Sequence, residues 1–165
     1  DYMPNHRQFI NHWQMLSGYT QLDLPGILNW LRKAQDAYLV SDAKNVKNKS
    51  LLRFIKCYHD DIIPRFIPQV FSYNEYLEAK KLGFKKIILA LYHFDPNDDE
   101  VIAFARQQGP ELIAVSVPLI RAKSLLPNKL KYFKIPTYTF TINQISVAKT
   151  LKKKGIKGYF SDFLI

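Results

Sequence analysis

Asp42 and Lys44 are the residues of this sequence whose types and spacing best support chemistry. They lie two positions apart in the run 38–44, whose composition is typical of a strand, so both side chains should point to the same face. A carboxylate and an ammonium on a buried strand are unfavourable unless they pair or bind something. Carboxylates bind Mg²⁺ or Ca²⁺, and lysine binds phosphate as a point charge. The pair predicts either a structural salt bridge or a metal ligand, Asp42, beside a phosphate-binding, catalytic Lys44.

Polar side chains also end other strand-like runs, and they are candidates for lining the same site. Gln69 and Tyr92 each lie at the end of a run, where substrate contact and ordinary packing would both explain them. In the run 137–143, alternation predicts a polar face toward the site and an apolar face packed on helices. The polar set is Thr137, Thr139, Thr141 and Asn143, of which Thr141 and Asn143 are the expected substrate contacts.

These residues depend on a regular alternation of strands and helices along the chain. Helix-like and strand-like runs of this kind predict βαβ units and a parallel sheet, and therefore an α/β fold. The expected strands are 38–44, 63–71, 86–92, 112–118, 137–143 and 158–164. The expected helices are 4–16, a segment from Asp23 through Leu31, a segment around 51–58, 74–82, 98–108, 121–133 and 144–154, with Gly83, Gly109 and Gly155 as C-cap glycines.

Two parallel architectures compete for this pattern. A doubly wound sheet usually has a glycine-rich phosphate loop after its first strand, and neither G-x-G-x-x-G nor G-x-x-x-x-G-K-[ST] occurs. A (β/α)₈ barrel needs eight strands, and six are counted. Since the sequence does not begin with Met, we expect two further β/α units before Asp1. Residues 1–165 are then a single, partial TIM-barrel domain.

Composition limits the partners. The 165 residues are 47% hydrophobic, as in globular proteins, and carry a net charge of +10. Lysines spread along helix faces indicate solvated surfaces first, and attraction to phosphate or an anionic membrane second. No nucleic-acid-binding signature occurs, so nucleic acid is not an expected partner. Cys57, the only cysteine, lies on an apolar helix face and is a poor nucleophile candidate. Of the four histidines, only His93 follows a strand, and an exposed loop histidine is the simpler interpretation.

The order of these motifs is similar to that of a known family. Y-L-V-S-D-A-K at 38–44 resembles the L-x-x-E-x-K strand of glycerophosphodiester phosphodiesterases, whose relatives include the phosphatidylinositol-phospholipase-C-like barrels. T-F-T-I-N at 139–143 resembles the late W-T-V-N strand of that family, and G-Y-F-S-D at 158–162 resembles its closing G-I-I-T-D strand. The resemblance covers the C-terminal three quarters of the chain, from Asp36 onward.

The resemblance implies a (β/α)₈ barrel that hydrolyses a phosphodiester with the help of a divalent cation, Mg²⁺ or Ca²⁺. In the family, two histidines act as acid and base, and a Glu-x-Asp pair and a later carboxylate hold the metal. The histidines and the Glu-x-Asp pair fall before the region that this chain covers. The later carboxylate corresponds to Asp42, which is one methylene shorter than the family's Glu, so the metal would lie closer or bind through water.

Two functions of different classes follow. The first is metal-dependent hydrolysis of glycerophosphodiesters or lipid headgroups, with the catalytic histidine pair expected upstream of this chain. The second is a non-catalytic barrel that binds a phosphorylated ligand or an anionic membrane surface. A barrel enzyme of unrelated chemistry is a third. Open sheet edges would favour an oligomer. The compartment stays open between cytoplasmic, membrane-associated and extracytoplasmic locations of a bacterial type.

Overall fold

The computed structural model of the chain describes residues 22–43, 46–92 and 94–163. The chain forms two compact units, 1–38 and 39–165. The single domain expected for 1–165 stays a prediction. No helix among the described residues is long and apolar enough to cross a bilayer. Several features of the sequence analysis lie outside the described residues: the helix 4–16, His6, His12, Lys44 and His93.

The described part of the first unit is one helix, α2 (Leu24–Lys33). Asp23 caps its start, because the Asp23 carboxylate accepts a hydrogen bond from the Gly26 amide at 2.8 Å. Pro25 occupies the first turn, where its missing N–H removes no helical hydrogen bond. The cap and the proline confirm the helix start that the sequence predicts.

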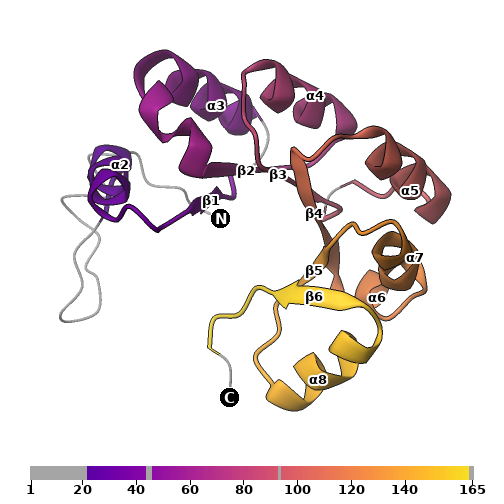
Figure 1. Cartoon of the computed structure of the whole chain (residues 1–165). Coiled ribbons are helices and arrows are strands. Elements are labelled where there is room, and N and C mark those ends of the chain that lie inside the picture. Colours follow the sequence, from indigo (N-terminus) through magenta and orange to yellow (C-terminus); the bar gives the residue numbers. More distant parts are fainter. Residues whose placement is uncertain (1–21, 44–45, 93, 164–165) are drawn as a thin grey trace. The chain divides into compact units, whose positions relative to one another are not determined.

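The second unit is built on a parallel sheet of six strands in the order β1-β2-β3-β4-β5-β6. All five neighbouring pairs are parallel. The sheet curls into a half-barrel, so the alternation of the sequence does correspond to parallel βαβ units (Figure 1). The strands are β1 (Leu39–Ser41), β2 (Phe66–Val70), β3 (Ile87–Ala90), β4 (Leu112–Pro118), β5 (Thr137–Phe140) and β6 (Ile156–Tyr159).

The helices of this unit lie along one side of the curled sheet (Figure 1). Buried side chains, such as Phe66 of β2, Phe84 of the loop before β3 and Leu126 of α7, form the core between them. The helices are α3 (Val46–Tyr58), the 3₁₀ segment η1 (Asp60–Arg65), α4 (Tyr73–Lys81), α5 (Asp98–Gln107), α6 (Leu119–Ala122), α7 (Leu126–Tyr132) and α8 (Ile145–Lys153).

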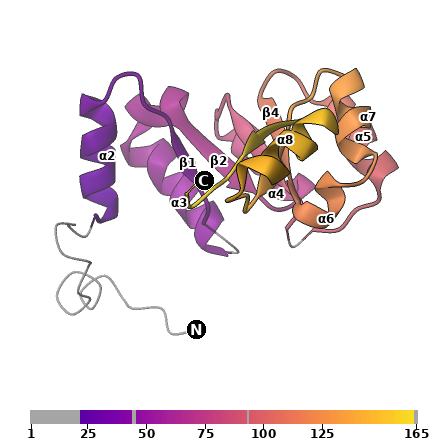
Figure 2. The same ribbon diagram turned by 90° about the horizontal axis from the view of Figure 1, so that it is seen from below.

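Several boundaries differ from those expected, and β1 and β5 are shorter than predicted, ending at Ser41 and Phe140. The segment 60–65 is a 3₁₀ turn, so β2 begins at Phe66 rather than at Ile63. The helix expected over 121–133 is two helices, α6 and α7, which Figure 2 shows as separate elements. Pro127 explains the division, because it would remove a hydrogen bond from a continuous helix and clash with the preceding turn. The last strand begins at Ile156 and ends at Tyr159.

Helices α4, α7 and α8 end in the same way, with the residue after the C-cap in the left-handed conformation. Gly83 and Gly155 adopt it with φ of 94°, as C-cap glycines do. Lys134 adopts it after α7 with φ of 60°, and its amide donates to the Lys131 carbonyl at 2.9 Å. Gly109, also expected as a cap glycine, has no positive φ, since α5 ends on extended Gln108.

The left-handed lysine leads to a stability prediction. Lys134→Gly should raise the free energy of unfolding by about 1 kcal/mol, because a Cβ at positive φ is strained and glycine has none. Lys134→Ala keeps the Cβ and should give no comparable gain. Chemical denaturation of the two variants and the parent chain measures both effects. Equal stability of the glycine and alanine variants would show that the backbone at this position is not strained.

Candidate functional site

The strands of the half-barrel have two faces, and the parallel register shows which side chains share each. The Tyr159 hydroxyl donates to the Ala148 carbonyl of α8 at 2.7 Å, so this face of β6 packs on helices. Burial raises the pKa of that hydroxyl. Tyr138 lies on the opposite face, which we call the open face, and packs against Ile67, Ile88 and Ala114.

Strand β5 has the reverse of the expected orientation. Its register pairs Thr139 with Tyr159, which puts Thr139 on the helix-covered face. Thr137 and Thr139 are fully buried, and the Thr139 hydroxyl donates to the Val117 carbonyl at 2.9 Å. Tyr138 and Phe140 therefore point to the open face. The expectation of a polar open face over Thr137 and Thr139 is wrong. The Thr139 hydroxyl is bonded to a neighbouring carbonyl, which is compatible with burial, while the Thr137 hydroxyl is buried without a partner among the described residues.

A cavity of about 600 Å³ lies on the open face where the strands end. The side chains of Asp42, Gln69 and Thr141 supply polar groups to its wall, and aromatic and aliphatic side chains form the rest. Carboxyl ends of parallel strands are where α/β proteins place their active sites. The lining consists of Val40, Asp42, Gln69, Phe71, Tyr92, Phe140, Thr141 and Phe160.

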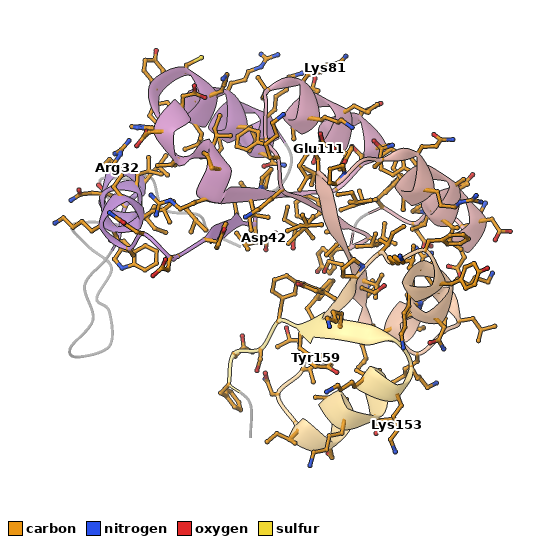
Figure 3. All side chains as sticks on the ribbon, viewed as in Figure 1. Arg32, Asp42, Lys81, Glu111, Lys153 and Tyr159 are labelled. Atoms are coloured by element: carbon orange, nitrogen blue, oxygen red, sulfur yellow. The ribbon has the colours of Figure 1, made fainter. Side chains whose placement is uncertain are left out.

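Asp42 and Gln69 form a direct contact at one wall of this cavity. The Gln69 side-chain amide donates to the Asp42 carboxylate at 3.1 Å. Figure 3 shows Asp42 just past the end of β1. The expectation that Asp42 shares a face with Val40 is confirmed, since both line the cavity. The salt bridge expected with Lys44 lies outside the described residues and stays a prediction.

A buried asparagine behind this wall holds the end of β2 in place. Asn48 of α3 is fully buried, and its amide donates at 3.3 Å to both the Gln69 carbonyl and the Glu75 carboxylate. The same carboxylate accepts the Phe71 amide at 2.9 Å. Gln69 and Phe71 are cavity residues, so Asn48 and Glu75 fix the backbone that presents them. Sequence reasoning did not identify this pair, because neither residue ends a strand.

The opposite wall is aromatic. Tyr92 follows β3 and packs edge-on against Phe140 of β5, with ring centroids 5.7 Å apart. Half of the Tyr92 side chain is exposed. The alternation along 137–143 predicts Phe140 on a helix-packed face, and Phe160 is part of the motif G-Y-F-S-D. The place of Phe140 in the cavity follows from the orientation of β5, and Phe160 lines it from the segment just after β6.

Thr141 and Asn143, the expected substrate contacts of the late strand, differ in their positions. Thr141 lines the cavity, whereas Asn143 is not among its lining residues. The Asn143 side-chain carbonyl accepts from the Ser161 hydroxyl and the Asp162 amide, both at 3.1 Å, and its amide donates to the Asp162 carboxylate at 3.3 Å. Asn143 therefore joins the segment after β5 to the segment after β6.

The divalent cation expected from the sequence has one described carboxylate at the cavity, Asp42. Among residues 22–43, 46–92 and 94–163, no group of three or more His, Cys, Asp or Glu side chains could hold a metal ion. Ca²⁺ takes six to eight oxygen ligands, whereas Mg²⁺ keeps several waters and uses one or two carboxylates. Among the described residues, Asp42 alone would supply a carboxylate to a cation in this cavity.

The second unit is an α/β half-barrel of parallel strands, like part of a TIM-type barrel, with a cavity at the carboxyl ends of its strands. A solved structure with a similar fold is that of a protein from Silicibacter pomeroyi, provisionally named a glycerophosphoryl diester phosphodiesterase. The TM-score is 0.58 at 13% sequence identity, over 85% of this chain.

This similarity has a limited scope. The chain spans 52% of the Silicibacter protein, about half of its length. At such low identity the likeness shows the fold alone, and it agrees with the fold family that the sequence resembles. No protein-family model matches the sequence. No curated protein matches it either.

Proposed function

We propose that this chain contributes to the hydrolysis of glycerophosphodiesters, with the cavity at the carboxyl ends of the strands as the substrate site. One observation carries the proposal: Asp42, Gln69, Tyr92 and Thr141, from four different strand ends, line one cavity. The fold similarity to a protein provisionally named glycerophosphoryl diester phosphodiesterase supports the reaction class.

The cavity has suitable groups for a small polyol phosphate. The Gln69 amide and the Thr141 hydroxyl can bond the hydroxyl and ester oxygens, and the aromatic wall of Tyr92 and Phe140 can cover the glycerol carbons. Lys44, two residues beyond Asp42, would neutralise charge on the phosphate oxygens. Mg²⁺ or Ca²⁺ would need ligands in addition to Asp42, and the sequence analysis expects these, with the histidine pair, upstream.

The first test is binding and turnover of glycerophosphocholine by the full-length protein, including the upstream residues that are expected to supply the histidine pair and the further metal ligands. We expect saturable binding that shifts the amide resonances of Gln69, Phe71 and Thr141, and turnover that a chelator abolishes. Asp42→Asn should weaken Mg²⁺-dependent binding about tenfold, since it removes the charge with little change in shape. Asp36→Asn, the same charge change in the other unit, is the matched control and should leave binding unchanged.

The non-catalytic alternative is favoured by a separate observation, the lack of a metal-ligating group of three among the described residues. It predicts that glycerophosphocholine shifts the same resonances while no glycerol phosphate is released, with or without Mg²⁺ or Ca²⁺. Binding without turnover would therefore replace the hydrolase proposal by a binding module. If neither binding nor turnover occurs, the cavity does not recognise glycerophosphodiesters and both proposals are overturned.

A further inference from the structure

A second cavity of about 380 Å³ lies at the opposite edge of the sheet, where β5 and β6 begin. Pro136 and Gly155, which immediately precede these strands, are part of its wall. The candidate active site lies at the other ends of the strands, so the two cavities are separate. The lining residues are Lys131, Lys134, Ile135, Pro136, Lys152, Gly155, Ile156 and Lys157.

All of the charged side chains that line this cavity are positive. Four lysines line it, and no acidic residue does. Among the described residues, no carboxylate forms an ion pair with any of the four. Lys134 also lines a neighbouring cavity of about 390 Å³ together with Arg106. Lysines grouped around a hollow without counter-charges repel one another, and an anion would relieve that repulsion.

The helix dipoles explain only part of this group. Cations near helix C-termini are favourable, and Lys131 and Lys152 lie in the last turns of α7 and α8. Lys134 and Lys157 lie beyond the helices, the first in the loop after α7 and the second in β6. A helix dipole therefore does not account for the position of these two lysines.

Lys134 provides the most specific argument. The structurally equivalent positions after α4 and α8 are Gly83 and Gly155, and only Lys134 carries a side chain at positive φ. Strained backbone positions are typical of sites where a side chain is required. The strain at Lys134 places an ammonium at the cavity where glycine would leave none.

We propose that this lysine-lined cavity is a binding site for a phosphate group, independent of the substrate cavity and of the proposed hydrolysis. Lysine ammonium groups bind phosphate as point charges, and Ile135, Pro136 and Ile156 form the apolar part of the cavity wall. The phosphate is either a free anion or the headgroup of an anionic phospholipid, which present the same chemistry.

The test uses the full chain with two probes, inorganic phosphate and vesicles of phosphatidylcholine with phosphatidylglycerol. A free-anion site predicts that inorganic phosphate shifts the amide resonances of Ile135, Gly155 and Ile156, while those of Gln69 and Thr141 stay unchanged. A headgroup site predicts cosedimentation with the mixed vesicles and not with pure phosphatidylcholine. If neither probe binds, the proposal is overturned.

Charge-matched variants separate this site from the general attraction of a chain with net charge +10. Lys134→Gln with Lys157→Gln should weaken binding by about fivefold for each lysine removed. Lys81→Gln with Lys149→Gln makes the same charge change at exposed lysines outside the cavity and should have much less effect. An equal loss in both double variants would show a diffuse electrostatic effect and overturn the site.

The Lys134→Gly variant tests whether a loss of anion binding could result from misfolding. This variant should be more stable than the parent and yet bind the anion about fivefold more weakly, because it removes one ammonium from the cavity. Stability and binding then change in opposite directions in one protein. Unchanged binding in this variant would show that Lys134 does not contact the anion.

Discussion

Replacing Tyr76 by alanine should lower the free energy of unfolding by about 4 kcal/mol, the cost of removing a large aromatic side chain from a packed core. Tyr76 of α4 is fully buried, and its ring packs edge-on against Phe104 with centroids 5.2 Å apart. Urea or guanidinium denaturation followed by circular dichroism measures the loss. Leu77→Ala on the same helix, at a side chain that is 42% exposed, is the control and should cost much less.

The hydroxyl of the same side chain should have the opposite effect on stability. It is buried without a hydrogen-bond partner among the described residues, and an unpaired buried hydroxyl is unfavourable. Tyr76→Phe should therefore raise the free energy of unfolding by about 1 kcal/mol. A destabilised phenylalanine variant would mean that the hydroxyl is paired after all.

The pH dependence gives an independent check on Tyr76. Burial, and then the Glu111 carboxylate, raises the pKa of its hydroxyl from 10.0 to about 12. Because the folded pKa is above the unfolded one, this contribution to stability is complete below pH 10 and is lost as the pH rises toward 12. Tyr76→Phe lacks this group, so its stability should fall less over that interval. Parallel losses in the two proteins would contradict the assignment.

Asn48→Ala should produce the second largest effect, a loss of about 3 kcal/mol, because it removes the buried amide that donates to both the Gln69 carbonyl and the Glu75 carboxylate. It should also weaken glycerophosphocholine binding, although Asn48 does not line the cavity, since it holds the β2 end that carries Gln69 and Phe71. Stability is measured by denaturation, and binding by titration.

Two variants distinguish a role of Asn48 in positioning the cavity wall from a general loss of stability. Asn74→Ala, at an exposed position of α4, should change stability by less than about 0.5 kcal/mol and leave binding unchanged. Tyr76→Ala should destabilise the fold at least as much as Asn48→Ala, yet bind normally where the protein is still folded. If Asn48→Ala also binds normally when folded, the Asn48–Glu75 network does not position the cavity wall.

Most of the cavity could be predicted because strand ends in a parallel sheet meet at one edge. Asp42, Gln69, Tyr92 and Thr141 lie far apart in the sequence, and the topology alone brings them to one cavity. Their chemical roles are a different matter. The sequence suggests those roles from residue type, strand-end position and a family resemblance, and neither the fold nor the cavity tests them.

Three features could not be predicted, each for a physical reason. Alternation divides β5 into two faces but does not say which is covered, and a threonine hydroxyl bonded to a backbone carbonyl makes the polar face the buried one. Asn48 acts through hydrogen bonds to residues more than 20 positions away, which no local pattern reveals. Lys134 is in a conformation for which sequence patterns predict glycine.

The cavity also has two walls that are anchored separately. Thr141 and Phe160 belong to the loop pair joined by Asn143, while Gln69 and Phe71 are held from behind by Asn48 and Glu75. Within the sheet, β3 and β4 lie between the strands that carry these two anchors. The distance between the two walls therefore depends on the curvature of the sheet, because a flatter sheet would move them apart. A ligand that fits tightly between the walls would resist flattening of the half-barrel, and a looser one would leave that motion free.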